Sequence, residues 1–269
     1  MIPKVIYYCW FGHNQKSKEI EMCMESWRKV CPEQEWKIVE INETNFDINF
    51  CNFTREAYAQ KKWAFVSDVA RLWAIYTYGG YYFDTDVELL EPLDRFLPYD
   101  CWFASNDVNF IATGLGFGAV AGHWLVGQLL EDYKDIPFEG NVCVQLNTAT
   151  IRKCLPDFQP TADTVVIENV LFLGMKDTGK VIHHLYLASW VEDNLRSHMK
   201  KRTKKKWLWA LKCKVRSPKI MNYLSKRKGK GSQIYTFFAY DFLDLGLVYW
   251  GKKAGKKLKA ALHLLSLIH

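Results

Sequence analysis

The chain has 269 residues, of which 49% are apolar and 24% charged, enough for a sizeable core in one large domain or one domain with an extension. No run approaches the roughly 18 consecutive apolar residues of a membrane-spanning helix. The first residues, Met1-Ile2-Pro3-Lys4, do not have the pattern of a signal peptide, and we expect none. The eight cysteines include no Cys-x-x-Cys pair and no zinc spacing, which indicates reduced, mostly buried thiols.

Hydrophobic periodicity predicts strands that alternate with helices along the first 190 residues. The expected strands are 2–10, 35–41, 81–84, 101–104, 116–120, 165–173 and 181–187, and the expected helices are 17–29, 54–61, 62–78, 123–133 and 144–154. Such alternation favours an α/β sandwich with a mostly parallel sheet flanked by helices.

Charge is divided unevenly along the chain. Residues 195–269 hold 20 Lys and Arg against two acids, a net of +18, whereas residues 1–194 have a net charge of −11. This shift predicts a domain at 1–194 and a basic, Trp-containing, helical extension at 195–269.

The segment around Asp84 and Asp86 carries the most chemical information. The helix at 62–78 ends at Gly79-Gly80, and a short aromatic strand then leads to Asp84-Thr85-Asp86. Acids at the point where a strand leaves the core occupy the usual ligand position of an open α/β sheet. Such a pair can simply cap a turn, but in this context we favour a site that holds a divalent metal against a diphosphate.

Two neighbouring pairs of residues support this site. Asp68 and Arg71 lie three residues apart on the preceding helix and so share one face. We favour a role in the site; the alternative is a plain surface ion pair, which would contribute little to stability. Tyr82 precedes Asp84 by two residues, so both side chains are expected on one face of the strand, with Tyr82 either touching a ligand or packing in the core.

At these residues the sequence resembles the glycosyltransferase family 32 type, the DXD-containing sugar-binding-region family. It is more distantly similar to the glucosyltransferase domains of large clostridial toxins. The resemblance begins at Ile2, is densest over residues 67–88, and returns at His183-His184 and Ser189-Trp190, so it covers roughly residues 1–190. It implies a GT-A type nucleotide-sugar-binding fold and a metal-dependent hexosyltransferase that retains anomeric configuration.

The resemblance also implies roles for single residues. Asp86 would bind Mn²⁺ or Mg²⁺ directly, and Asp84 would reach the metal through water or hold ribose. Asp68 would contact hydroxyls of the donor sugar, and Arg71 would help to hold sugar and phosphate. Trp10 and the adjacent backbone at Phe11 would meet the nucleotide base, with a core position as the alternative for Trp10.

A late loop of the family closes over the diphosphate, and His183-His184 with Ser189-Trp190 resemble it. Adjacent strand residues face opposite ways, so at most one His is expected at the metal; we choose His184, with a packed strand histidine as the alternative. Four residues separate His184 from Ser189, where the family has about three, which leaves the choice of His and the role of Ser189 open. Residues 113–118 match the stretch that lines donor and acceptor sugars, although a glycine-rich strand with bulges is the plainer interpretation.

The basic extension predicts an anionic partner. Lys and Arg interleaved with Trp207 and Trp209 favour an anionic membrane surface, because each basic residue near anionic lipid contributes about 1 kcal/mol. A nucleic acid is the less favoured partner. A solvated basic face is the alternative.

We therefore expect a cytoplasmic enzyme, peripheral on the inner face of the membrane, that acts in surface polysaccharide synthesis. It would move a hexose from a UDP- or GDP-linked donor to a saccharide or lipid-linked saccharide acceptor. The competing hypothesis is a membrane- or nucleic-acid-binding protein that acts through residues 195–269 alone.

Overall fold

The computed structural model describes residues 1–105, 110–138, 143–159, 163–185 and 187. These residues belong to the first of the chain's two units, Met1–Trp190. The boundary expected at residue 194 and the roles expected for Trp207, Trp209 and the rest of 195–269 lie outside the described residues and stay predictions.

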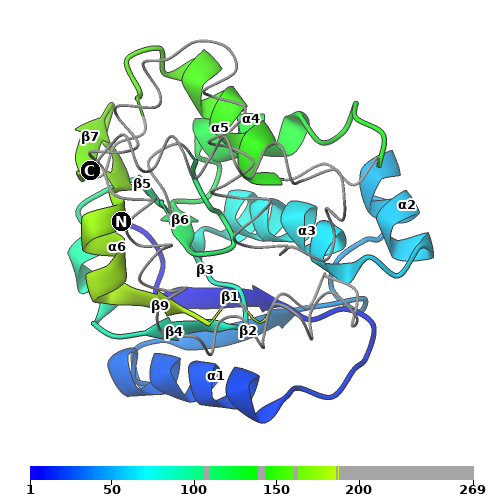
Figure 1. Ribbon diagram of the computed structural model, residues 1–269, viewed down its shortest axis with the longest axis horizontal. Helices are drawn as coiled ribbons and strands as arrows, with labels where there is room; N and C mark the ends of the chain where they lie inside the picture. Colours follow the sequence, from blue (N-terminus) through cyan, green and yellow to red (C-terminus); the bar gives the residue numbers. More distant parts are fainter. Residues whose placement is uncertain (106–109, 139–142, 160–162, 186, 188–269) are drawn as a thin grey trace, which may run out of the picture. The chain divides into compact units, whose positions relative to one another are not determined.

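A seven-stranded sheet forms the centre of this unit, in the order β2-β1-β3-β6-β5-β8-β7 (Figure 1). Its strands are β1 (Val5–Cys9), β2 (Lys37–Ile41), β3 (Gly80–Tyr82), β5 (Cys101–Ala104), β6 (Phe117–Ala119), β7 (Val165–Ile167) and β8 (Val170–Leu173). The pairs β1–β2, β1–β3 and β5–β8 are parallel, whereas β6 is antiparallel to both of its neighbours and β7 to β8. Five of the seven strands thus run in one direction, which confirms the expected mostly parallel sheet.

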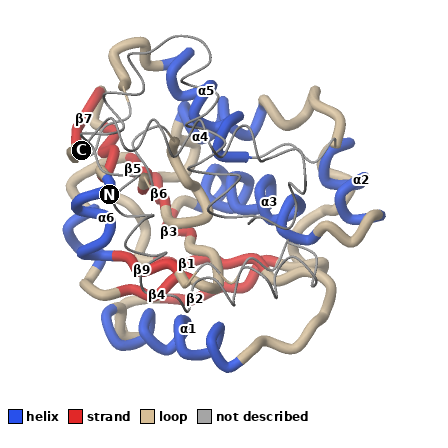
Figure 2. The backbone as a smooth tube through the Cα atoms, in the orientation of Figure 1, coloured by secondary structure: helices blue, strands red, loops and turns tan. Residues whose placement is uncertain are grey.

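Helices cover both faces of the sheet (Figure 2). One face packs against α2 (Asn52–Ala59), α3 (Trp63–Tyr78), α4 (Trp124–Glu131) and α5 (Cys143–Cys154). The other packs against α1 (Lys18–Val30), α6 (Met175–Val181), the 3₁₀-helix at Leu93–Phe96 and a second sheet made of β4 (Val87–Leu89) and β9 (Ile182–His184). The predicted α/β fold class, with helices flanking the sheet, is confirmed.

Two expectations for the last strands were wrong. The strand predicted at 165–173 is a hairpin, because Glu168 and Asn169 adopt positive φ angles of 48° and 63° that reverse the chain between β7 and β8. The strand predicted at 181–187 is shorter and leaves the main sheet: β9 pairs antiparallel with β4, which puts Val87 opposite His184. No local pattern predicts this second sheet.

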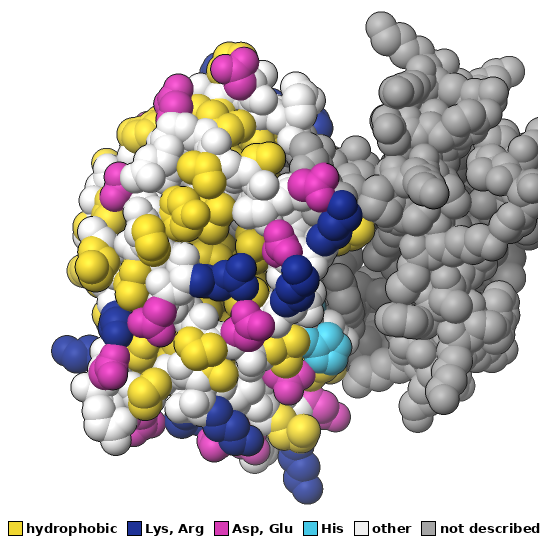
Figure 3. Space-filling view, turned by 90° about the vertical axis from the view of Figure 1, so that its left-hand side faces the viewer, with side chains coloured by type: hydrophobic (Ala, Val, Ile, Leu, Met, Phe, Trp, Pro, Cys, Tyr) yellow, Lys and Arg dark blue, Asp and Glu magenta, His cyan; other side chains and the backbone are white. Residues whose placement is uncertain are grey.

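The described part of the unit has a surface of mixed charge and cysteines that are not disulfide-bonded. On the face shown in Figure 3, acidic and basic side chains are intermixed, with hydrophobic side chains between them. Within the described ranges, no helix is long and apolar enough to cross a membrane. The cysteines of the same ranges are free thiols, and five of the seven are buried.

Candidate functional site

The first half of α3 carries a buried ion pair. Apolar residues at three- and four-residue steps, among them Val66, Val69 and Leu72, bury one side of this helix and take Asp68 and Arg71 with them. Asp68 is 7% exposed and Arg71 3% exposed, and Arg71 Nη2 contacts Asp68 Oδ1. The plain surface pair considered from the sequence is therefore wrong, because both groups have left water and depend on each other for compensation.

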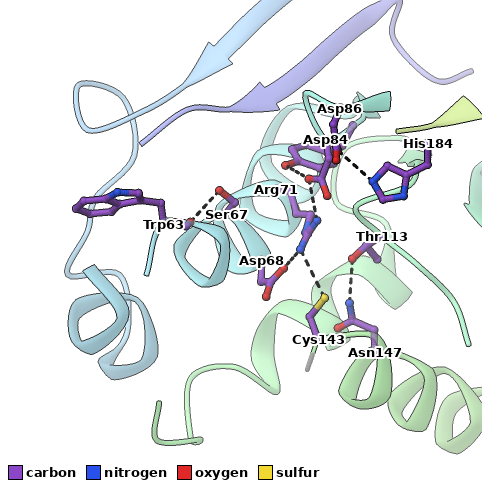
Figure 4. Close-up of polar contacts among 11 residues, drawn as sticks. Trp63, Ser67, Asp68, Arg71, Asp84, Asp86, Thr113, Cys143, Asn147 and His184 are labelled. Atoms are coloured by element: carbon purple, nitrogen blue, oxygen red, sulfur yellow. Dashed lines mark hydrogen bonds and ion pairs between the residues drawn. The ribbon is translucent and has the colours of Figure 1, made fainter. Parts of the chain in front are cut away.

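Asp84 joins this pair from the end of the central strand β3 (Figure 4). Its Oδ1 lies 3.2 Å from Arg71 Nη1 and accepts a hydrogen bond from the Tyr82 hydroxyl at 2.8 Å. The Arg71 guanidinium carbon also lies 5.4 Å from the centre of the Tyr82 ring. The prediction that Tyr82 and Asp84 share one face is confirmed, and Tyr82 holds the carboxylate.

The backbone at Gly114 closes the site against Asp84 and Arg71. The Asp84 N–H donates to the Gly114 carbonyl at 2.8 Å. A Cβ atom at Gly114 would overlap Asp84 Oδ2 and lie 2.7 Å from Arg71 Nη1, so the approach of this backbone requires glycine. The stretch 113–118, singled out in the sequence, is thus brought to the site at its Gly114 end.

Asp86 belongs to a second contact, made by the β4–β9 sheet. Its Oδ1 lies 3.1 Å from His184 Nε2, and its Oδ2 accepts the Leu187 N–H at 2.9 Å. His183 points to the other side, where Nδ1 lies 2.9 Å from Glu88 Oε2 and the side chain is 58% exposed. The expected alternation is confirmed, and His184 is the histidine beside the acid pair.

The electrostatics favour the charged forms of these groups. Burial by itself raises the pKa of Asp86, but hydrogen bonds from His184 and Leu187 outweigh it, and the net pKa is lowered. Burial lowers the pKa of His184, but Asp86 reverses this and the net pKa is raised. Burial likewise opposes the charge on Arg71, and the neighbouring Asp84 carboxylate raises its pKa overall.

The residues fit a divalent metal only in part. Among the described residues, no group of three or more His, Cys, Asp or Glu side chains is arranged to hold an ion, so Asp84, Asp86 and His184 do not form a complete set of ligands. Their chemistry does fit a metal that a substrate completes, because Mg²⁺ in nucleotide enzymes usually takes one or two carboxylates together with phosphate oxygens. The side chains of Asp84 and Asp86 are 37% and 17% exposed and present hard oxygens of this kind.

The residues expected at the nucleotide base lie beyond the end of β1. Trp10 is half-buried; its indole N–H donates to the Asn14 carbonyl at 2.7 Å, and Lys16 Nζ lies 5.1 Å from its ring centre. Phe11 is 4% exposed and its side chain packs edge-on against Phe46 in the core, so that side chain is not available to a ligand. Ser189 and Trp190 lie outside the described residues, and their roles stay predictions.

The sequence interpretation missed the contribution of α5. Arg71 Nη2 donates to Cys143 Sγ at 3.6 Å, and one turn later Asn147 Nδ2 donates to Thr113 Oγ1 at 3.1 Å with both residues fully buried (Figure 4). A polar residue at a core position of an amphipathic helix was the available signal for Asn147, and Cys143 gave none. The site is therefore walled by α3, α5 and the 113–114 backbone.

Comparisons with known proteins give one family match and two distant structural likenesses. Residues 17–103 match the family described as the glycosyltransferase sugar-binding region containing DXD motif, a range that includes Asp68, Arg71, Asp84 and Asp86. The PaToxG glycosyltransferase is similar over 58% of this chain and 70% of its own, with 15% identity and a TM-score of 0.46. A glycosyltransferase involved in the glycosylation of the major capsid of PBCV-1 is similar over 74% of this chain and 100% of its own, with 10% identity and a TM-score of 0.40. Neither likeness is close enough to inform the chemistry.

Proposed function

Because residues 17–103 are a glycosyltransferase sugar-binding region of the DXD type, we propose that this protein transfers a hexose from a UDP- or GDP-linked donor with the help of a divalent metal. One observation carries the proposal. The buried pair Asp68–Arg71 meets Asp84 at the end of β3, two residues before Asp86. A buried cation next to partly exposed carboxylates suits a site that must hold a diphosphate and a metal together.

The residues divide the work between leaving group and sugar. Asp84 and Asp86 would hold Mn²⁺ or Mg²⁺, which when bound neutralises negative charge that develops on the departing diphosphate. Arg71 supplies a fixed positive charge beside them, and its contacts with Asp68, Asp84 and Tyr82 keep the guanidinium oriented before the donor arrives. Asp68 would accept hydrogen bonds from hydroxyls of the donor sugar.

We further propose that the anomeric configuration is retained. Among the described residues of the site, we assign no carboxylate the role of a covalent nucleophile. The acceptor would then attack from the face that the leaving group departs from, and its proton would pass to the departing phosphate oxygen. Arg71 would stabilise that oxygen as its charge grows, together with the divalent metal that Asp84 and Asp86 would hold.

The acceptor is proposed to be a saccharide or lipid-linked saccharide in surface polysaccharide synthesis, used close to an anionic membrane. The charge of residues 195–269, a net of +18, supports this location. Flotation of the full chain with anionic and with neutral vesicles tests the membrane component. Equal recovery with both kinds of vesicle would remove it.

Donor hydrolysis tests the enzymatic proposal. The chain is incubated with a panel of UDP- and GDP-sugars and Mn²⁺, with EDTA in a parallel reaction, and Asp86→Ala is compared with Glu88→Ala. Glu88 is a matched control because it lies on the adjoining strand β4 and contacts His183 on the outer side. We expect hydrolysis of at least one donor, its loss with EDTA and in Asp86→Ala, and its retention in Glu88→Ala. Hydrolysis that is unchanged in Asp86→Ala would show that the metal assignment is wrong.

A further inference from the structure

A groove between α3 and α4 lies apart from the residues described above. Its volume is about 560 Å³, within the range of small-molecule sites, and it is open to solvent. Aromatic and polar side chains share its lining; those used below are Trp73, Tyr76, Trp124, Gln128, Glu131 and Lys134. The two helices lie next to each other on one face of the sheet (Figure 1).

Exposed aromatic side chains gather at this groove. Within the described ranges, the aromatic residues more than a third exposed are Tyr76, Tyr78 and Trp124, at 39%, 52% and 47%. Tyr76 and Trp124 line the groove, and Tyr78 packs edge-on against Trp73 of its wall with ring centres 5.6 Å apart. Large aromatic faces left in water at one place are typical of a binding surface, whereas single exposed apolar residues are ordinary.

The groove is held in shape without a ligand. A Cβ atom at Gly127 would lie 2.7 Å from Tyr76 Cε2, so the Tyr76 ring rests directly on the backbone of α4. The Gly122 N–H also donates to the Tyr76 carbonyl at 2.7 Å, which ties the end of α3 to the start of α4. A ring that is fixed before binding loses little conformational entropy when a ligand stacks on it.

The polar rim favours an uncharged ligand. Glu131 Oε2 and Lys134 Nζ form an ion pair at 2.6 Å and so cancel each other's charge. Gln128 is an uncharged lining residue, and its Nε2 donates to Asp132 Oδ1 at 2.9 Å. A nucleic acid or anionic lipid would need a basic excess, which these residues do not supply.

We propose that this groove binds a neutral saccharide. A pyranose ring has apolar C–H faces that stack on Trp124 and Tyr76, and hydroxyls that exchange hydrogen bonds with Gln128, Glu131 and Lys134. Tyr76 lies eight residues after Asp68, about 12 Å further along α3, so the groove can be occupied independently of the donor site. The bound saccharide would be a segment of the acceptor. Only this last identification rests on the proposed glycosyltransferase function.

Affinity electrophoresis of the full chain tests the binding without donor or turnover. The native protein is run through gels that contain dextran, mannan or galactan, and through gels that contain the acidic polymer alginate. We expect retardation by at least one neutral polysaccharide, at least tenfold weaker in Trp124→Ala and in Tyr76→Ala. Met22→Ala, which removes an apolar side chain 72% exposed on α1, is expected to run as the parent does.

The outcomes separate the groove from the active site. Asp86→Ala is expected to keep full retardation, and retardation in a protein that hydrolyses no donor would leave the saccharide site standing while the proposed reaction falls. The inference is overturned if no neutral polysaccharide retards the chain, if only alginate does, or if both aromatic variants bind as the parent does. Circular dichroism of each variant shows that it is folded.

Discussion

Arg71 on α3 and Asp84 beyond β3 form an ion pair of 3.2 Å between Nη1 and Oδ1. The pair joins the helix that precedes the central strand to the acid that follows it, and Asp68 and Tyr82 each hold one of the two partners. Because Arg71 is 3% exposed, its charge depends on these carboxylates and not on water.

Removal of the Arg71 charge should destabilise the fold. Arg71→Met leaves Asp68 buried without compensation, and we expect a loss of about 3–5 kcal/mol in the free energy of unfolding. The double variant Arg71→Met with Asp68→Leu should recover part of that loss, because the orphaned carboxylate is gone. Urea unfolding followed by fluorescence measures both. A single variant as stable as the parent would contradict the buried pair.

The two tyrosines of β3 should respond differently to loss of the hydroxyl. Tyr82→Phe removes the hydrogen bond to Asp84 and should cost about 1–2 kcal/mol of stability. Because Asp84 would then be held less firmly, donor hydrolysis should respond more weakly to added Mn²⁺. Tyr81→Phe is the matched control, because the buried Tyr81 hydroxyl has no hydrogen-bond partner among the described residues and its removal should be neutral or stabilising. Equal effects of the two substitutions would show that the hydrogen bond from Tyr82 to Asp84 does not contribute to stability.

Gly114→Ala should damage the site more than the fold. The added methyl would overlap Asp84 Oδ2, and relieving this overlap is expected to cost about 1–3 kcal/mol and to reduce donor hydrolysis at least tenfold. Gly179→Ala is the control, because a Cβ there meets nothing within 4 Å and alanine is preferred over glycine inside a helix. Thermal unfolding and initial rates are measured on both proteins.

His123 should make stability depend on pH. Burial lowers its pKa in the folded state, with a smaller opposing effect of Asp100, so the folded protein favours the neutral ring. The unfolded chain binds the proton first as the pH falls below about 6.5, and stability should drop from there toward the folded pKa. His123→Asn should flatten this part of the profile, measured as the free energy of unfolding at pH 7.5 and 5.5. An unchanged slope would assign the loss to other groups.

Local features of the site were accessible from the sequence because they depend on neighbours along one element. The apolar steps of α3 and the stop at Gly79 predict a helix at 62–78, and the structure has Trp63–Tyr78. The spacing of Asp68 and Arg71 places them on one helix face, and that of Tyr82 and Asp84 on one strand face. These shared faces follow from backbone geometry alone.

Other parts of the site depend on where distant segments meet. His184 reaches Asp86 across 98 residues because β9 turns away from the main sheet to pair with β4, and the reversal at Glu168 and Asn169 that ends β7 has no strong turn signal. Gly114 is required only because β6 and its preceding loop bring its backbone against Asp84. The sequence alone determined which acids and which arginine stand near the central strand, since helix and strand periods are local. Tertiary structure decided that they are buried, which histidine joins them and which backbone closes over them, since burial and long-range pairing depend on the packing of the whole unit.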